Sequence, residues 1–520
     1  MSKLDTSLNE RKEIINYLKR VEQKRKLTLK ELKVIGDKLS KMSKLKIKIT
    51  LKNFDLTENK KLLKRYSLLM GYLKDESLID PLLERYFTKE KSENYKSAII
   101  SILKSYDIDI SSLLINDLLD TKSASFKSLC IELLNEAEKN ELILAYFIEG
   151  IFYLDDRNKE IFLNEFLRVG GDKALKLIEV LAESGDEVIE KIAVEILGKV
   201  RNTKSANILN KIKHFAFNDK IRMFAERNLR KLSFLMIYPD EVLPEKNIMV
   251  RSFVNYLGGI DGTGNRGLWI YFKNNLSRGI NINILLNEEW GIVDCYSNDS
   301  TSKAEFDRMI TQIKREEHIM PVPFDYAFAL VNDAISLNLS KGIPFPPEFI
   351  IRKKYFYGIF QNFREYVPVF KDLNLESIKK DKFYLHASAS LFNLPEFEDW
   401  IILNSVIFDY VELYKKLRDN FSGNKEQISF LLKRIYEGAV ADKLEQLKRR
   451  LFLMAEFYYK FYQRKKTLSK ILLSAALNLD SCNEYLYAVN PFIRALIINS
   501  LENAGEAMDD KLDFGEFSDK

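Results

Sequence analysis

Three glycines, Gly262, Gly264 and Gly267, match the pattern G-x-G-x-x-G, which binds nucleotide phosphates in many proteins. A dinucleotide-binding fold needs a helix directly after these glycines, so that the helix N-terminus faces the pyrophosphate. The sequence that follows, LWIYF at residues 268–272, is rich in aromatic and β-branched residues and is typical of a strand. We therefore interpret residues 258–267 as a turn between two strands, with glycines supplying positive φ angles, and expect no cofactor.

A protein-kinase glycine loop also lies between two strands, so the sequence must be tested for the other parts of a kinase. The next strand, INILL at residues 282–286, has no lysine for the phosphates, and no His-Arg-Asp catalytic sequence occurs. The sequence DFG appears only at residues 513–515, after an acidic run near the C-terminal end. A kinase is therefore not expected.

The same loop carries Asp261, Thr263 and Asn265 at alternate positions, as a calcium-binding loop does. The obligatory glycine and the bidentate glutamate are missing, because Arg266 and Phe272 stand in their places. Elsewhere, none of the three histidines has a second ligand three or four residues away, and the three cysteines are more than 150 residues apart. The usual spacings of metal ligands are therefore absent. The residues concerned are His214, His318, His386, Cys130, Cys295 and Cys482. We expect no metal site.

Hydrolysis by a pair of carboxylates is the chemistry that the sequence leaves open. With 75 acidic residues, many pairs are possible, and spacing along the chain does not choose among them. Asp294 and Asp299, beside the last predicted strand, are the first candidates. A pocket lined by converging charged groups near Asp294 or His318 would favour an enzyme. No catalytic residue is assigned.

The composition describes a large, mainly helical protein. At 520 residues the chain is too long for one compact core, and 11 prolines and 20 glycines are few for an all-β design. No apolar run approaches the roughly 18–20 residues of a transmembrane helix, and the N-terminal sequence has no signal-peptide core. The scattered cysteines fit a reducing compartment. We expect a cytoplasmic protein.

The net charge of +6 hides a basic N-terminal segment and an acidic tail. Residues 1–53 hold sixteen Lys and Arg against six Asp and Glu, or +10, whereas residues 502–520 sum to −5. Two helices are predicted over residues 8–42, followed by an alternating sequence, KLKIKITLK, at residues 44–52. We interpret these residues as an edge strand whose lysines discourage further pairing; the alternative is a contact surface for phosphate or anionic lipid.

From residue 56 to residue 235 the sequence repeats. A pair of apolar residues spaced by four recurs every 30 to 33 residues, and the six pairs are Tyr66/Met70, Ala98/Ile102, Cys130/Leu134, Leu163/Leu167, Ala193/Leu197 and Ala225/Leu229. Gly71 and Gly198 follow the first helix of two units that match in detail. A helix pair of this length cannot bury its apolar stripe alone, so neighbouring pairs are expected to stack.

Two segments, DEVIEKIAVEILGKV from Asp186 and DKIRMFAERNLRKL from Asp219, carry an aspartate, a small residue and a leucine in the order found in HEAT repeats. Residues 56–235 therefore resemble HEAT-type helical repeats. The resemblance implies an α-solenoid, an architecture that binds proteins or nucleic acids, and implies no catalysis.

Beyond the repeats, the spacing of apolar residues changes to two. Strands are predicted over 249–257, 267–274, 280–287 and 291–296, as an antiparallel meander followed by a helix to about residue 317. Helices follow over 324–340, 346–357, 397–420, 424–437, 441–466, 467–479 and 490–504. In helix 441–466 the apolar stripe is interpreted as core, and the cations at 449, 450 and 464–466 as solvated ends.

The predicted fold is thus mainly α: a HEAT-like α-solenoid, then an α+β region with a small antiparallel sheet and a helical C-terminus. The predicted domains are 1–53, 54–240, 248–320, 321–504 and an acidic tail at 505–520. The leading hypothesis is an intracellular protein-interaction scaffold rather than an enzyme. The alternatives are nucleic-acid or anionic-surface binding through the basic segment, and an enzyme whose site lies between the sheet and the C-terminal helices.

Overall fold

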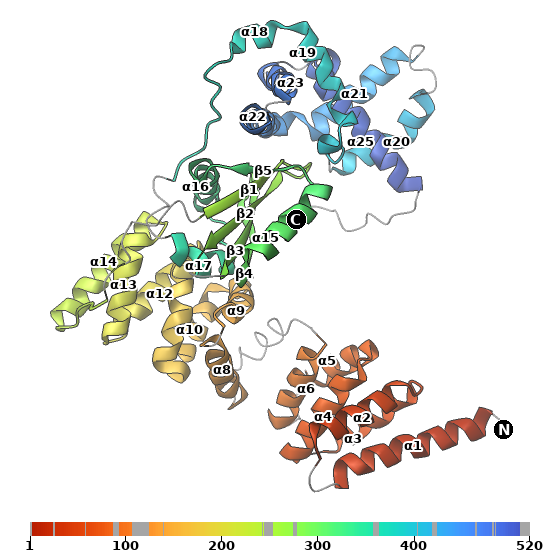
Figure 1. The fold of residues 1–520 in the computed structure, drawn as a ribbon, viewed down its shortest axis with the longest axis vertical. Helices are drawn as coiled ribbons and strands as arrows, with labels where there is room; N and C mark the ends of the chain where they lie inside the picture. The colour runs from red at the N-terminus through yellow and green to blue at the C-terminus, as the bar shows by residue number, and fades with distance from the viewer. Residues whose placement is uncertain are drawn as a thin grey trace. The chain divides into compact units, whose positions relative to one another are not determined.

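The computed structural model describes residues 3–509, except 24–26, 58, 87–92, 107–123, 139, 242, 244–252, 274–277, 357–362, 403, 419–423, 463–464, 481–482 and 484. Cys482, the DFG sequence at 513–515 and the predicted strand residues 249–252 lie outside this range. The described chain is mainly helical and contains one five-stranded sheet. It divides into two compact units, Met1–Leu177 and Ile178–Lys520, each of which is described by itself (Figure 1). No described helix combines the length and the apolar character needed to cross a membrane.

The first unit begins with four packed helices: α1 (Lys3–Gln23), α2 (Leu29–Ser40), α3 (Leu45–Asp55) and α4 (Lys60–Leu73). Their shared core includes Ile14, Leu18, Leu32 and Tyr66. A capping box of Thr28 and Glu31 begins α2. The basic N-terminal segment therefore folds into helices whose apolar side chains form a shared hydrophobic core.

The predicted strand at 44–52 is wrong, because these residues form helix α3. The alternation of lysine and aliphatic residues fits period two, but Ile47, Leu51 and Phe54 also recur at helical spacing and are buried together. Lysine and leucine are good helix formers, so packing of this stripe decides for helix. The lysines consequently do not share one face: Lys46 is buried, whereas Lys48 is exposed.

The rest of the first unit consists of helices that pack with their neighbours along the sequence. They are α5 (Ile79–Tyr86), α6 (Glu93–Lys104), α8 (Ala124–Ala137), α9 (Ile143–Phe152) and α10 (Asp156–Gly170). Helix α4 contacts α6, and α8 contacts both α9 and α10. The apolar pairs that define the sequence repeat are buried here, except for Leu167, which is half-buried.

The second unit begins with α12 (Glu187–Lys199), α13 (Thr203–Phe215) and α14 (Asp219–Phe234), which contact one another. Asp186, Asn202 and Asn218 cap their N-termini. Gly198 permits close packing of α12 on α14, because a Cβ there would lie 2.4 Å from Asn228 Oδ1. Helices α12 and α14 carry the last two apolar pairs of the sequence repeat, Ala193/Leu197 and Ala225/Leu229.

The sheet contains β1 (Phe253–Gly258), β2 (Asn265–Lys273), β3 (Arg278–Asn287), β4 (Gly291–Ser302) and β5 (Ile319–Val322), in the order β4-β3-β2-β1-β5. All neighbouring strands are antiparallel, so the predicted four-strand meander is confirmed. The fifth strand was not predicted, since it is only four residues long and contains Pro321. Helix α15 (Lys303–Glu316) precedes it and packs on the sheet through Phe306, whose ring centroid lies 5.1 Å from that of Tyr271.

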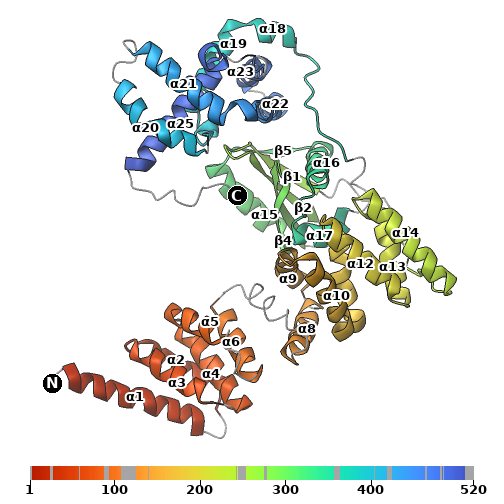
Figure 2. The same cartoon turned by 180° about the vertical axis from the view of Figure 1, so that it is seen from behind.

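Helix α16 (Phe324–Lys341) also contacts the sheet, and α17 (Pro347–Arg352) contacts β4 (Figure 2). Phe217, after α13, packs against Phe345 and Phe349 at centroid distances of 5.2 and 6.0 Å. Lys353 forms a buried ion pair with Glu183 and lies 4.0 Å from the Phe217 ring centroid. Burial lowers the pKa of Lys353. These contacts join α12–α14 to the sheet-containing part of the second unit.

The C-terminal region is helical, as predicted: α18 (Leu375–Lys380), α19 (Lys382–Ala387), α20 (Ser405–Arg418), α21 (Lys425–Ala439), α22 (Leu444–Phe461), α23 (Lys466–Leu477), α24 (Leu486–Val489) and α25 (Pro491–Asp509). Helix α22 packs along α23 and also contacts β5. Its predicted apolar stripe is largely buried, with Leu451, Met454 and Tyr458 fully enclosed. Helix α22 is therefore the element that brings this region against the sheet.

Candidate functional site

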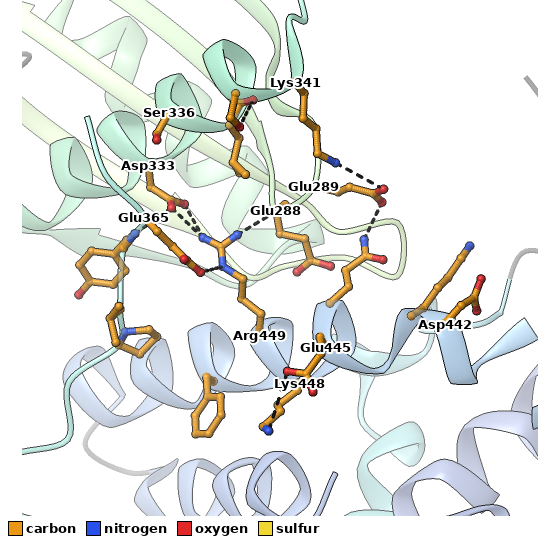
Figure 3. Close-up of a pocket in the computed structure, with 18 residues that line it drawn as sticks. Glu288, Glu289, Asp333, Ser336, Lys341, Glu365, Asp442, Glu445, Lys448 and Arg449 are labelled. Atoms are coloured by element: carbon orange, nitrogen blue, oxygen red, sulfur yellow. Dashed lines mark hydrogen bonds and ion pairs between the residues drawn. The ribbon is translucent and has the colours of Figure 1, made fainter. Parts of the chain in front are cut away.

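A cavity of about 880 Å³ lies between α16, the β3–β4 turn, residues 365–368 and the N-terminal half of α22 (Figure 3). We call it the α16–α22 cleft. Its wall is mostly charged, with six acidic and four basic side chains: Glu288, Glu289, Asp333, Glu365, Asp442, Glu445, Lys341, Lys443, Lys448 and Arg449. The cleft lies between the sheet layer and the C-terminal helices, where the sequence analysis placed a possible enzyme site.

The β3–β4 turn presents two carboxylates to the cleft. Asn287 Oδ1 accepts hydrogen bonds from the backbone N–H groups of Glu289 and Trp290, at 2.8 and 2.9 Å. Gly291 then adopts a φ of +82°, which returns the chain into β4. An asparagine that bonds to the backbone two and three residues ahead fixes such a turn locally. Glu288 and Glu289 are therefore held in place by the turn itself.

Arg449 is the central cation of the cleft. Its Nη2 lies 2.7 and 2.8 Å from the two carboxylate oxygens of Asp333, and its Nη1 donates to the backbone oxygen of Glu288 at 2.8 Å. Asp333 also accepts a hydrogen bond from the backbone N–H of Tyr366 at 2.8 Å. Burial raises the pKa of Asp333, and the Arg449 charge opposes that shift. The pair links α22 to α16.

Arg450 makes a second buried pair, with Glu288. Its Nε donates to Glu288 Oε1 at 2.5 Å, and its Nη1 donates to the Gly262 oxygen at 2.6 Å. Burial raises the pKa of Glu288 to about 7, although the Arg450 charge lowers it. The second carboxylate oxygen, Oε2, is buried and has no hydrogen-bond partner among the described residues. A buried acceptor without a donor costs stability, so the pairing of Glu288 with Arg450 is important for this part of the fold.

The outer part of the cleft is more exposed. Glu289 accepts a hydrogen bond from Gln446 at 2.8 Å and lies 3.7 Å from Lys341, whose ammonium is 4.7 Å from the Trp290 ring. Lys448 and Glu445 form a pair at 3.9 Å on α22. Within the described ranges, no three His, Cys, Asp or Glu side chains are grouped as a metal site requires. The cleft can therefore offer charge and hydrogen bonds to a polar small molecule.

The predicted turn at 258–267 connects β1 to β2, as expected. Asp261 Oδ1 accepts from the backbone N–H groups of Thr263 and Asn265, both at 2.9 Å. A Cβ on Gly262 would lie 1.7 Å from the Asp399 backbone oxygen, so the loop packs directly against the C-terminal region. Arg266 is buried and donates to the Gly258 oxygen at 2.9 Å. The glycines thus have structural roles.

The acidic residues named from sequence do not line the cleft. Asp294 is exposed and accepts from the backbone N–H of Cys295 at 2.7 Å. Asp299 pairs at 2.7 Å with Arg352, a buried cation whose Nε also donates to Ser297 Oγ at 2.6 Å. These contacts join β4 to α17. They do not bring Asp294 and Asp299 together at a point where both could contact one substrate.

The histidines are also separate. His318 lies 3.3 Å from Glu396, which also pairs with Lys465. The Nδ1 of His214 lies 2.8 Å from the Asn210 oxygen, and His386 is exposed on α19. Cys130 and Cys295 are both buried, and burial raises the pKa of each thiol, that of Cys130 to about 12. The described histidines and cysteines form no common site.

Sequence reasoning missed the residues that the structure brings together. Arg449 and Arg450 were interpreted as solvated ends of a long helix, but both form buried ion pairs. A usable signal was Asp333, which is the only charged residue in the largely apolar sequence AFALVNDAISL of α16. A charged residue at a core position predicts a buried partner. The partner itself, more than 100 residues away, could not be identified from one sequence.

The chain matches no protein-family model, no curated protein sequence and no solved structure.

Proposed function

We propose that this protein is an intracellular interaction scaffold, in which residues 54–240 form a HEAT-like α-solenoid that binds a protein partner. The regular spacing of apolar pairs supports this proposal. So do the contacts that the first helices of successive units make with each other, α4 with α6, α8 with α10 and α12 with α14. Arrays of this kind present extended surfaces to partners.

The observation that carries the proposal is a set of exposed apolar residues on α14 and directly after it. Four large side chains are exposed there by 55 to 86%: Met223, Phe234, Met236 and Tyr238. The last helix of a repeat array needs a polar outer face if it meets only water. Large apolar side chains with this much exposure instead mark a surface that a partner covers. We call these residues the α14 surface.

The chemistry of the α14 surface defines its occupant as a protein segment with apolar side chains and a carboxylate. Arg227 is exposed, four residues after Met223 and seven before Phe234, so the three lie along one side of the helix. Arg230, seven residues after Met223, lies on the same side and is also exposed. Apolar residues with two cations between them match an amphipathic helix that carries acidic residues.

The test compares matched variants of the full chain. The variant Met223→Ser/Phe234→Ser/Met236→Ser and the control Tyr153→Ser/Phe430→Ser are each used to capture partners from native lysate, which mass spectrometry identifies. A captured protein is then purified, and its affinity is measured by calorimetry. We expect the α14 variant to bind at least about tenfold more weakly, as for loss of apolar anchors. Equal binding by both variants would refute the α14 surface as the interface.

A second candidate function, binding of a small polar ligand in the α16–α22 cleft, is favoured by the ten charged side chains that line this cavity, among them Glu288. The cleft volume of about 880 Å³ is within the range of ligand sites. We propose a ligand with N–H or O–H donors, such as an amine or a sugar. A thermal-shift screen of amino acids, polyamines and sugars tests it: a hit must raise the melting temperature of the wild type and lose its effect in Glu288→Gln. If no compound shifts the wild type, this second function is rejected.

A further inference from the structure

The first unit contains a groove of about 420 Å³ between α1 and α3. Four cations line it, two from each helix: Arg11, Lys19, Lys48 and Lys52. Its apolar floor includes Ile15 and Ile49, both half-buried. We call it the α1–α3 groove. It is distinct from the α14 surface and is formed by residues that precede the proposed solenoid.

The groove arises because two helices turn similar faces toward each other. On α1, Arg11, Ile15 and Lys19 are spaced by four, so they form one row along the helix. On α3, Lys48 and Lys52 form a second row with the same spacing. Helix α3 thus places two of its lysines beside the cations of α1.

Unlike Lys46 and Lys38, the groove cations have no described partner, a property that they share with the exposed lysines Lys33 and Lys64. Lys46 donates to the Ser40 and Met42 oxygens and pairs with Asp75 at 3.1 Å, and Lys38 lies over the Tyr17 ring. By contrast, the structure gives no hydrogen bond or ion pair with any described residue for the four groove cations.

One carboxylate, Glu22, is present in the groove lining, and it already accepts a hydrogen bond from the Tyr66 hydroxyl at 2.6 Å. Like charges held close together repel one another, so a cluster of this kind is relieved by an anionic partner. Four of the sixteen Lys and Arg residues of the segment 1–53 thus line one defined groove.

We propose that the α1–α3 groove binds an acidic, amphipathic helical segment of a partner protein. Carboxylates would meet the two rows of cations, and apolar side chains would cover Ile15 and Ile49. A nucleic-acid site fits less well, because the lining has no aromatic residue for base stacking and four cations make a small phosphate footprint. A membrane surface is flat, whereas these cations line a concavity. This proposal goes beyond the scaffold function and does not depend on the α14 surface.

The test uses the full chain and a fluorescent helical peptide with leucines at i, i+4 and i+7 and glutamates at the other surface positions. Anisotropy gives its affinity for the wild type, for Lys48→Glu/Lys52→Glu, and for the matched control Lys33→Glu/Lys64→Glu, whose lysines are exposed on α2 and α4. We expect the groove variant to bind about tenfold or more weakly and the control to stay within about twofold. Circular dichroism melts verify that both variants fold.

Two further probes make the result specific. A peptide of the same composition but scrambled order must bind about tenfold more weakly, since it presents no apolar stripe. The affinity for single-stranded oligonucleotides and for phosphatidylserine vesicles must not fall in the same way in the Lys48→Glu/Lys52→Glu variant. The proposal is overturned if the wild type does not bind the peptide, if both charge variants weaken binding equally, or if oligonucleotides or vesicles alone depend on the groove.

Discussion

The guanidinium of Arg449 holds both carboxylate oxygens of Asp333, at 2.7 and 2.8 Å, across the α16–α22 cleft. Asp333 belongs to α16, which contacts the sheet, and Arg449 belongs to α22, which packs along α23 in the C-terminal region. The side chains are 9% and 18% exposed, respectively, so the pair is largely removed from water. This single pair therefore joins two parts of the second unit that lie more than 100 residues apart in sequence.

Replacing Arg449 by alanine should destabilise the second unit by about 3–5 kcal/mol, because it leaves the buried Asp333 carboxylate without a counter-charge. The three tryptophans, Trp269, Trp290 and Trp400, all belong to this unit, so denaturation followed by tryptophan fluorescence reports on it alone. Lys448→Ala on the same helix is the control and should cost at most about 1 kcal/mol. A similar loss for both variants would contradict a buried pair at Arg449.

The dependence of stability on pH should show that the Glu190 carboxyl titrates with a raised pKa. Burial raises the pKa of this carboxyl from 4.5 to about 7. The folded protein thus holds the proton more tightly than the unfolded chain, so this contribution to stability is complete below about pH 4.5 and is lost as the pH rises through about 7. Glu190→Gln cannot ionise. Its melting temperature, relative to the wild type, should therefore rise between about pH 5 and about pH 8.

Melting curves of Glu190→Gln and the wild type across this pH range check the prediction. The glutamine keeps an oxygen that can accept from the Gly185 backbone N–H, now 2.9 Å from Glu190 Oε1. Any loss at the second oxygen is independent of pH and cancels in the comparison. A melting-temperature difference that stays constant with pH would show that Glu190 does not titrate with a raised pKa.

Much of the fold could be predicted because the relevant signals are local. Period-two spacing gave the four strands of the meander, and polar caps such as Asn202 and Asn218 mark helix starts. The error at Lys44–Lys52 shows the limit of this reasoning. That sequence satisfies both a strand and a helix pattern, and only the packing of Ile47 and Leu51 in the core of the first unit decides between them. Strand β5 was missed because a four-residue strand has almost no periodicity.

The candidate site was much less predictable than the fold. The general location, between the sheet and the C-terminal helices, was anticipated, but its residues were not. Glu288, Asp333 and Arg449 come from three distant segments, and each alone has the spacing of an ordinary surface or helix residue. Asp294 and Asp299 were candidates because both lie beside a predicted strand. In the structure, Asp299 pairs with Arg352 instead. Charge pairing over such distances requires coordinates.

Leu197 tests the packing of the repeat helices. It is fully buried on α12, so Leu197→Ala should cost about 2–5 kcal/mol, as other large-to-small core changes do. The equivalent residue on α14, Leu229, is half-buried, and its replacement by alanine should cost clearly less. Urea denaturation followed by circular dichroism measures both. A loss below about 0.5 kcal/mol for Leu197→Ala would show that its position is not core.

The glycine loop gives the last prediction. Gly262→Ala places a methyl group where the Asp399 backbone oxygen lies, so the loop or the C-terminal region must shift, and we expect a loss of about 1–3 kcal/mol or more, as for other overpacked sites. Gly342→Ala is the control for a methyl group added in open space, because no atom lies within 4 Å of the added Cβ; its φ of +65° adds a backbone strain that Gly262 does not have. The control should show only the backbone strain of about 1 kcal/mol.

The same loop should not respond to nucleotides, because its backbone is held by Asp261, Asp399 and Arg450 rather than left open toward a phosphate. ATP, GTP and NAD, each with magnesium, should leave the wild-type melting temperature unchanged. A dose-dependent rise with any of them, abolished by Gly262→Ala but retained by Gly342→Ala, would contradict the structural role of the loop. In that case the glycines would have to be assigned to nucleotide binding, and the protein would have to be considered an enzyme.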